Sequence, residues 1–484
     1  MTERHCRVAI IGTGFSGIGT AIRLKQDGID DLVLFERAAD LGGTWRDNTY
    51  PGCACDVPSH LYSFSFAPNP RWGHTYSRQS EIWQYLRDCA ERFGILPHIR
   101  FGHEVLGATW QDDAQHWRIE TSAGIWNAEM LVSGAGILSE PRWPEIPGID
   151  SFAGTAFHSA QWDHAQDLSG RTVAVIGTGA SAIQFVPEIQ KRVAKLVLFM
   201  RTPPWIVPRN DRPLHAWEHR LYGLFPPAQL ALRATSYWYR EALLRGFLRP
   251  SEGGFGERLA GRHLESQVAD AALRAKLTPS YRMGCKRILI SNDFYPALQQ
   301  PNVELVTEAI AAIRAGGVVT ADGTLHGVDT IVFGTGFNVT EHPIAGRIFG
   351  RTGESLAETW AGSPKAHLGT TVAGFPNLFI LLGPNTAIGH TSALFMVESQ
   401  IALVRAALET MRALGAKSFE PRAEAQASFV SSIDQRMQHT VWLTGGCASW
   451  YKDRTGRVAA LWPDYTWSFR RRLAHFDTRE YRLA

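Results

Sequence analysis

Arg7-Val-Ala-Ile-Ile11, followed at once by Gly12-Thr-Gly14-Phe-Ser-Gly17, is the stretch of sequence that decides the fold. The apolar run predicts a β-strand, and the apolar spacing from Ile18 to Leu24 predicts a helix after the glycines. The next apolar run begins at Leu32 and ends in Glu36. Such glycines permit a tight turn and a close approach of the backbone to a pyrophosphate, and the acid can accept hydrogen bonds from a ribose. The stretch therefore predicts a βαβ unit that binds a dinucleotide.

The same pattern occurs again 165 positions later. Arg171-Thr-Val-Ala-Val-Ile176 enters Gly177-Thr-Gly179-Ala-Ser-Ala182, and a second Leu-Val-Leu-Phe run is followed by Met200 and Arg201. An acid in this place favours a free 2′-hydroxyl, whereas an arginine favours a 2′-phosphate. The first unit therefore suits the ADP half of FAD and the second suits NADP. The alternative is that both are ordinary strand-to-helix turns and that Arg201 is a surface charge.

Length and composition exclude several classes of protein. A chain of 484 residues with 45% hydrophobic residues can form two or three domains with ample core and needs no disulfide staples. The net charge of +3 and the absence of long runs of one sign argue against nucleic-acid binding. No apolar stretch reaches the roughly 20 residues of a membrane span, and no paired zinc-ligand spacing accompanies the six cysteines. We expect a soluble cytoplasmic protein without a metal site.

Further patterns divide the chain. Pro141-Arg-Trp-Pro144-Glu-Ile-Pro147 is a candidate linker, and two strands, one starting at Met130 and one at Thr330, end in glycines that could face a cofactor or simply make a turn. A buried strand is expected after Phe375, and a helix near Ser392. The predicted fold is α/β, with two Rossmann-like dinucleotide-binding domains and a helical insertion. The ranges are 1–145 and 335–484 for the FAD domain and its substrate-pocket loops, 150–210 and 283–334 for the NADP domain, and 211–282 for the insertion.

The insertion contains a series of large apolar residues at helical spacing. They are Trp217, Leu221, Leu224, Phe225, Leu230 and Leu232. The pattern predicts amphipathic helices, and we favour a packed cover over docking to a membrane or a partner protein.

Two longer motifs carry a resemblance to a known family. Phe152-Ala-Gly154-Thr-Ala-Phe-His158-Ser-Ala-Gln-Trp162-Asp163 has the form F-x-G-x-x-x-H-x-x-x-W-[P/D], and Gly42-Gly-Thr-Trp45 is followed by Tyr50-Pro-Gly-Cys-Ala-Cys-Asp56. In these motifs the chain resembles the single-component, FAD- and NADPH-dependent Baeyer–Villiger monooxygenases. The resemblance covers essentially the whole chain and becomes looser beyond about residue 386. A tyrosine in place of Trp162 would instead resemble flavin monooxygenases that oxidise nitrogen or sulfur.

The resemblance implies a reaction and a catalytic pair. NADPH reduces FAD, O₂ adds to form a peroxyflavin, and one oxygen atom is inserted beside a ketone carbonyl to give an ester or lactone, with oxidation of some sulfides as well. A nucleophilic peroxide anion needs a permanent positive charge beside it, which an arginine supplies. By similarity this charge is Arg287, oriented by Asp56.

The resemblance also implies a set of cofactor contacts. Lys286, Arg201 and Thr202 would hold the 2′-phosphate of NADP, and Gly154, His158 and Trp162 would couple motion of the NADP domain to flavin access without proton transfer. The remaining residues expected at the two nucleotides are Gly12, Gly14, Phe15, Gly17, Glu36, Thr44, Trp45, Asp56, Tyr62, Gly177, Gly179, Ser181 and Ala182.

Other functions stay open at this stage. An N- or S-oxygenating flavin monooxygenase is the first alternative, and Trp162 argues against it. A pyridine-nucleotide disulfide reductase would need a C-x-x-C or C-x₄-C pair, and Cys53 and Cys55 do not form one. A third alternative keeps FAD as a structural ligand without catalysis. The ketone and the oligomeric state are not determined by these patterns.

Overall fold

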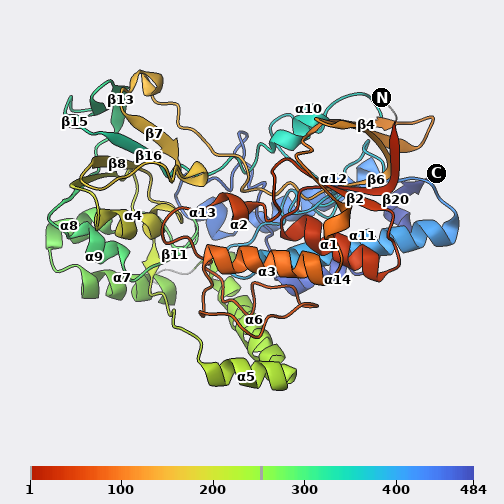
Figure 1. Ribbon diagram of the computed structural model, residues 1–484, viewed down its shortest axis with the longest axis horizontal. Helices are drawn as coiled ribbons and strands as arrows, with labels where there is room; N and C mark the ends of the chain where they lie inside the picture. Colours follow the sequence, from red (N-terminus) through yellow and green to blue (C-terminus); the bar gives the residue numbers. More distant parts are fainter. Residues whose placement is uncertain (1–2, 251–253) are drawn as a thin grey trace.

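The first glycine turn lies in the larger of two parallel-strand sheets. The computed structural model describes residues 3–250 and 254–484, and its eight-stranded sheet has the order β17-β4-β5-β6-β1-β2-β3, with β18 also paired to β6 (Figure 1). Strands β6, β1, β2 and β3 run parallel to one another, whereas β4, β5 and β6 are antiparallel. The bounds are β1 Arg4–Ile11, β2 Leu32–Glu36, β3 Ile99–Phe101, β4 Val105–Gln111, β5 His116–Thr121, β6 Gly124–Ser133, β17 Ile348–Phe349 and β18 Leu378–Ile380.

The second glycine turn lies in a five-stranded sheet with the order β12-β9-β8-β16-β7, in which every pair is parallel. The two predicted Rossmann-like cores are therefore confirmed. The bounds are β7 Thr155–His158, β8 Thr172–Ile176, β9 Lys195–Phe199, β12 Val303–Val306 and β16 Thr330–Phe333. Smaller sheets contain β10 Ile206–Val207 with β11 Leu289–Ile290, β13 Ile310–Arg314 with β14 Gly317–Thr320 and β15 Leu325–Gly327, and β19 Phe419–Pro421 with β20 Tyr481–Leu483.

Helices cover these sheets and fill the space between them. They are α1 Phe15–Gln26, α2 Thr44–Asp47, α3 Gln79–Arg92, α4 Ala182–Gln190, α5 Ala216–Leu224, α6 Pro226–Leu248, α7 Phe255–Gln267, α8 Ala271–Leu277, α9 Phe294–Leu298, α10 Leu356–Trp360, α11 Ala393–Leu414, α12 Ala423–Met437, α13 Val441–Thr444 and α14 Thr466–Leu473. The helix predicted near Ser392 is α11, and the Ser392 side chain caps it by accepting a hydrogen bond from the Leu394 amide. Across the described residues, no helix is long and apolar enough to cross a membrane.

Both glycine turns are shaped by a neighbouring strand end. Gly12 has φ +89°, and a Cβ there would lie 2.8 Å from the carbonyl oxygen of Gly134, just after β6. Gly177 has φ +113°, and a Cβ there would lie 2.4 Å from the carbonyl oxygen of Gly334, just after β16. Glycine is thus required at both turns by backbone conformation and by close approach. The two strands predicted to end in glycine do end there, each against its own nucleotide turn.

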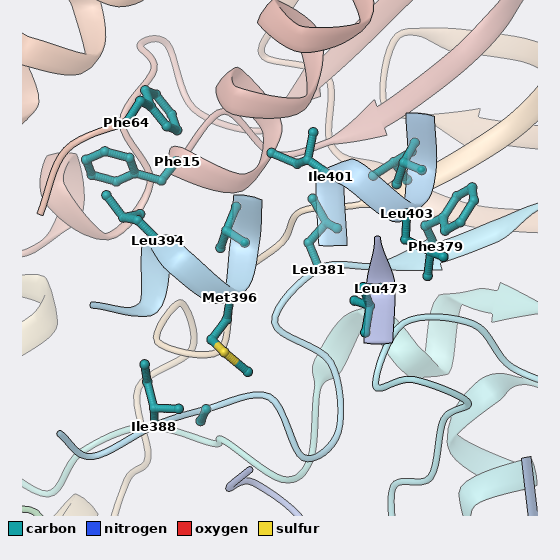
Figure 2. Close-up of a cluster of buried hydrophobic side chains, with 14 of the residues drawn as sticks. Phe15, Phe64, Phe379, Leu381, Ile388, Leu394, Met396, Ile401, Leu403 and Leu473 are labelled. Atoms are coloured by element: carbon teal, nitrogen blue, oxygen red, sulfur yellow. The ribbon is translucent and has the colours of Figure 1, made fainter. Parts of the chain in front are cut away.

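The main hydrophobic core joins the two ends of the chain. Phe15 from α1 and Phe64 lie close to Leu394 of α11, and Phe379 of β18 lies near Leu403 of α11 (Figure 2). All five side chains are buried. Because α11 packs on α1, the C-terminal third of the chain completes the layer over the first glycine turn.

Two chain crossings connect the larger sheet to the smaller one. The segment at Pro141 forms a bridge with Phe337, and the Arg142 amide donates to the carbonyl oxygen of Gly336 at 2.8 Å. The Asn338 amide donates to the carbonyl oxygen of Glu140 at 3.1 Å. The predicted proline-rich linker is therefore paired with the returning chain, so the two crossings form one short antiparallel connection.

The helical insertion was predicted to cover the protein with its large apolar residues facing inward, and this orientation is wrong. Helices occupy this region as expected, but the apolar residues on which the prediction rested are exposed, namely Trp217, Leu221, Leu224, Phe225, Leu230 and Leu232. In α6 the inward positions are instead Gln229, Tyr237, Glu241 and Leu244. The spacing identified an amphipathic helix correctly, but a spacing alone does not say which side faces the protein.

A disulfide joins Cys285 to Cys447, although length and composition predict that the core needs none. Cys285 is fully buried directly before Lys286 and Arg287, and Cys447 follows α13 in the C-terminal part. The two cysteines are 162 positions apart, so no short spacing marks them as a pair. The bond holds the C-terminal loop against the segment that carries Arg287.

Candidate active site

Asp56 and Arg287 form a two-pronged ion pair. Arg287 Nε donates to Asp56 Oδ2 at 2.8 Å, and Arg287 Nη2 donates to Asp56 Oδ1 at 2.7 Å. Arg287 Nη1 has no hydrogen-bond partner among the described residues. The side chains are 30% and 23% exposed, so the pair is sheltered but open on one side. Two donors thus fix the guanidinium plane, and a third remains for another group.

The pair holds both of its members in their charged forms. Asp56 raises the pKa of Arg287 further above its already high ordinary value, against the effect of burial. Burial alone would raise the pKa of Asp56, but the charge of Arg287 and its hydrogen bonds lower it below the ordinary range. Arg287 is therefore a permanent cation at any pH at which the protein folds.

Two further residues near this pair were missed by the sequence analysis. Tyr451 is buried and close enough to Arg287 to act on its charge, and burial raises the pKa of Tyr451 to about 12, so its hydroxyl stays protonated. Arg240 from α6 adds positive charge beside Asp56 and donates to the carbonyl oxygen of His390 at 3.3 Å. Both come from distant segments whose patterns carry no sign of their place in the site.

The first glycine turn forms an open cradle at the start of α1. The helix has no side-chain cap, so its first amides are available to an anion. A Cβ on Gly43 would lie 3.2 Å from the Cα of Gly14, and Gly17 would have its Cβ 1.9 Å from the carbonyl oxygen of Gly12. The backbone is thus bare where a pyrophosphate would have to approach, and this fits a dinucleotide.

Glu36 lies at the end of β2. Its carboxylate accepts from the Thr13 hydroxyl at 2.6 Å and from the Ala38 amide at 3.0 Å, and it pairs with Arg46 at 2.9 Å. These contacts hold the side chain of Glu36, which is almost fully buried, in a fixed orientation. Its contact with a ribose stays a prediction.

Aromatic residues from the second family motif line the same region. Trp45 Nε1 donates to the Tyr62 hydroxyl at 3.1 Å, and the Phe15 and Tyr62 rings meet edge to face at 5.3 Å. The Thr44 hydroxyl donates to the carbonyl oxygen of Leu138 at 3.4 Å. The structure therefore brings together Phe15, Thr44, Trp45 and Tyr62 beside the first glycine turn.

At the second turn, two cations lie near each other without an acid between them. Burial and the charge of Arg201 both lower the pKa of Lys286, and neither side chain has an ion-pair partner among the described residues. Thr202 is adjacent, since its carbonyl oxygen accepts from the Thr178 hydroxyl at 3.4 Å. Uncompensated like charges of this kind fit a dianionic phosphate. The helix that begins at Ala182, preceded by Gly179 and Ser181, has no side-chain cap either.

The His158 motif lies at the paired crossings. His158 is fully buried at the end of β7, its Nδ1 accepts from the Ala160 amide at 3.1 Å, and its ring lies 6.1 Å from that of Phe337. Trp162 packs on Phe185 of α4 at 5.3 Å between ring centres. The motif therefore touches both the connection between the sheets and the helix of the second turn. A Cβ on Gly154 would lie 2.3 Å from the carbonyl oxygen of Asp329, which excludes a side chain there.

His158 is expected to make stability depend on pH. Burial lowers its pKa from 6.5 to about 4, so the unfolded chain takes up a proton before the folded protein does. Stability should therefore fall as the pH drops from 6.5 towards 4, and His158→Gln should lose less stability over this range than the wild type. Urea unfolding at about pH 7 and about pH 5 measures the difference. The exposed His475→Gln serves as control; equal pH dependence in wild type and His158→Gln would contradict the prediction.

Gln184 of α4 connects the second unit to the Asp56 motif. Its side chain accepts from the Tyr50 hydroxyl at 3.3 Å and from the Ala54 amide at 3.2 Å, and it donates to the carbonyl oxygen of Ala54 at 3.1 Å. Cys53 and Cys55 in this motif are free thiols, and burial raises the pKa of both, that of Cys53 to about 12. They are therefore protonated and poorly suited to redox chemistry.

Comparison with known proteins points to one family. The family model described as flavin-binding monooxygenase-like matches residues 5–345. A Baeyer–Villiger monooxygenase of Streptomyces coelicolor is 49% identical, covering 99% of this chain and 93% of that protein, and one of Pseudomonas aeruginosa is 47% identical, covering 99% and 92%. The solved structure of cyclohexanone monooxygenase from Rhodococcus sp. Phi1 bound to NADP⁺ has a TM-score of 0.87 at 27% identity, covering 100% of this chain and 99% of that one.

Proposed function

This chain belongs to the flavin-binding monooxygenase-like family, and on that premise we propose that it oxidises ketones to esters or lactones with Arg287 and Asp56 as catalytic residues. It is a Baeyer–Villiger monooxygenase with FAD and NADP(H) as cofactors. The observation that carries the proposed roles is the guanidinium of Arg287, held in plane by Asp56 with Nη1 left free. The N- or S-oxygenating alternative is not favoured, since the relatives at 49% and 47% identity bear the Baeyer–Villiger name.

Arg287 would act as a fixed positive charge. When bound, NADPH supplies the hydride and FAD the oxygen chemistry. Arg287 Nη1 would donate to the oxygen on which negative charge develops, and the guanidinium loses no proton while it does so. Asp56 would keep the donor aimed, and the buried Tyr451 and the disulfide at Cys285 would hold the C-terminal segments around it.

Arg201, Thr202 and Lys286 would select NADP over NAD. Their support is the pair of cations without an acid partner, which a 2′-phosphate would neutralise. Gly177, Gly179, Ser181 and Ala182 would present the bare start of α4 to the pyrophosphate.

The FAD contacts would be made around the first turn. Gly12, Gly14 and Gly17 leave the backbone open to the pyrophosphate, and Glu36 would accept from the ribose. Phe15, Thr44, Trp45, Asp56 and Tyr62 would line the flavin side of the same cradle.

We keep the predicted division into an FAD domain (1–145 and 335–484) and an NADP domain (150–210 and 283–334) as a proposal. His158 and Trp162, with Gly154, would transmit movement between them, because they contact both the paired crossings and α4.

We also propose that the enzyme works in the cytoplasm, where NADPH is supplied.

The function is tested directly by product analysis. The FAD-loaded enzyme should oxidise NADPH and consume O₂ when a cyclic, linear or aryl ketone is added, and mass spectrometry should detect the lactone or ester. An amine and a sulfide serve as comparison substrates. N-oxide formation without any ester from the ketone panel would overturn the proposed substrate class.

A further inference from the structure

The end of α5 and the outer side of α6 expose several large apolar side chains. Leu224, at the end of α5, is 86% exposed, and Trp238 and Tyr239 in α6 are 58% and 65% exposed. With Phe225, Leu230 and Leu243 they form what we call the docking face. Figure 1 shows α5 and α6 projecting from the lower side of the molecule, apart from both large sheets. Large apolar side chains gathered on two consecutive helices are unusual on a free surface and mark an interaction site.

The inward side of α6 buries Tyr237 and Leu244 in the main core, and its polar side chains are satisfied by the rest of the protein. Gln229 donates to the carbonyl oxygen of Asn69 at 2.7 Å, and Arg233 donates to the carbonyl oxygen of His60 at 2.8 Å. Glu241 bonds to His390 at 2.9 Å and accepts from the Thr466 hydroxyl at 2.7 Å. These contacts fix the rotation of α6, so the docking face cannot turn inward without breaking buried polar pairs.

The exposed charges along the segment from Arg212 to Arg249 have one sign. Between Arg212 and Arg249 the only acids are Glu218 and Glu241, both of which are at most 3% exposed. Glu218 pairs with Arg212. Arg220, Arg245 and Arg249 are exposed and have no ion-pair partner among the described residues. The exposed charges of this segment are therefore positive only.

We propose that α5 and α6 dock the protein onto an anionic phospholipid surface through the docking face. Tryptophan, tyrosine, phenylalanine and leucine beside arginines are the residues that enter the boundary between headgroups and acyl chains, while the arginines meet anionic headgroups. A second copy of this chain would bring the same arginines together, which disfavours a symmetric pairing of this face. This docking is peripheral, in agreement with the lack of a spanning helix among the described residues.

Docking by α6 would place the active site next to the lipid. Arg240 lies on the inward side of the same helix, beside Asp56, and between Tyr239 of the docking face and the buried Glu241. One helix thus has its outer side on the proposed lipid surface and its inner side at the catalytic pair.

Vesicle sedimentation tests the proposal without any turnover, so its outcome is separate from that of the proposed function. The FAD-loaded protein is mixed with vesicles of phosphatidylcholine and phosphatidylglycerol in equal parts, or of phosphatidylcholine alone. We expect sedimentation with the anionic vesicles, decreasing with salt, and about 5-fold weaker binding for each of Arg220→Gln and Arg245→Gln. The double variant Leu224→Ser/Trp238→Ser should lose binding by about 10-fold or more.

The matched control is Leu325→Ser, which removes a comparably exposed leucine from β15, outside the docking face. It should bind as the wild type does. FAD content and melting temperature show that each variant is folded. Three results would each overturn the proposal: no sedimentation of the wild type with either vesicle, equal binding to both vesicle types at all salt concentrations, or a lipid-free dimer that the double variant abolishes.

Discussion

Arg287→Ala is expected to reduce ester formation by about 10³-fold while NADPH still reduces the bound FAD. The substitution removes the only group of the Asp56 pair that could donate to a developing negative charge, and alanine offers no substitute. Flavin reduction depends on the nucleotide contacts and should persist. Stopped-flow absorbance of the flavin measures the reduction, and mass spectrometry of the product measures the oxygenation.

Controls separate the catalytic role from a structural one. Loss of the cation leaves Asp56 without its partner, so FAD content and melting temperature must be compared with the wild type. Arg287→Lys keeps the charge but not the two-pronged geometry and should retain part of the activity. Arg282→Ala removes a guanidinium five positions earlier that pairs with Glu257, and its product yield should be near normal. A normal ester yield from Arg287→Ala would reject the assignment.

Arg201→Ala is expected to raise the KM for NADPH by about 10- to 100-fold and to leave that for NADH nearly unchanged. Arg201 and Lys286 repel each other in the absence of an anion, and a 2′-phosphate would relieve that repulsion. NADH lacks the phosphate and would gain nothing from either cation. Steady-state kinetics of nucleotide oxidation measure both constants. Arg192→Ala, after α4 in the same sheet unit, is the matched control.

The NADPH prediction has a clear contrary outcome. If Arg201→Ala raises the KM for NADPH and for NADH equally, the side chain binds the part that the two nucleotides share and not the 2′-phosphate. Lys286→Ala should show the same selectivity, because it contributes the second of the two cations.

Local patterns predicted those parts of the molecule that are decided locally. The glycines at 12 and 177 are required by positive φ angles and by backbone contacts a few ångströms away, and both turns were identified. The pairing of Asp56 with Arg287 spans 231 positions, and only the family resemblance indicated it. Its geometry, with Nη1 left free, could not be predicted from any spacing.

The features that were missed depend on contacts between distant segments. Cys285 and Cys447 carry no spacing signal, and Tyr451 lies in a region where the resemblance is loose. The rotation of α6 is set by Gln229, Arg233 and Glu241, whose partners lie in other segments. Apolar periodicity shows that two sides of a helix differ. Which side faces the protein is decided by the partners that Gln229, Arg233 and Glu241 find in other segments.

The late arrival of β18 has a consequence for biosynthesis. Leu378–Ile380 of β18 pairs with Leu131–Ser133 of β6. This pairing of β6 can form only after the ribosome has added 247 more residues (380 − 133). At ribosomal rates of about 5–20 residues per second, that interval is on the order of 10–50 s. All five strands of the second sheet, from Thr155 to Phe333, emerge within it and can assemble first. Until then Leu131 and Val132 of β6 can pair with β1 on one edge only, and their other edge stays open as a natural target for chaperones.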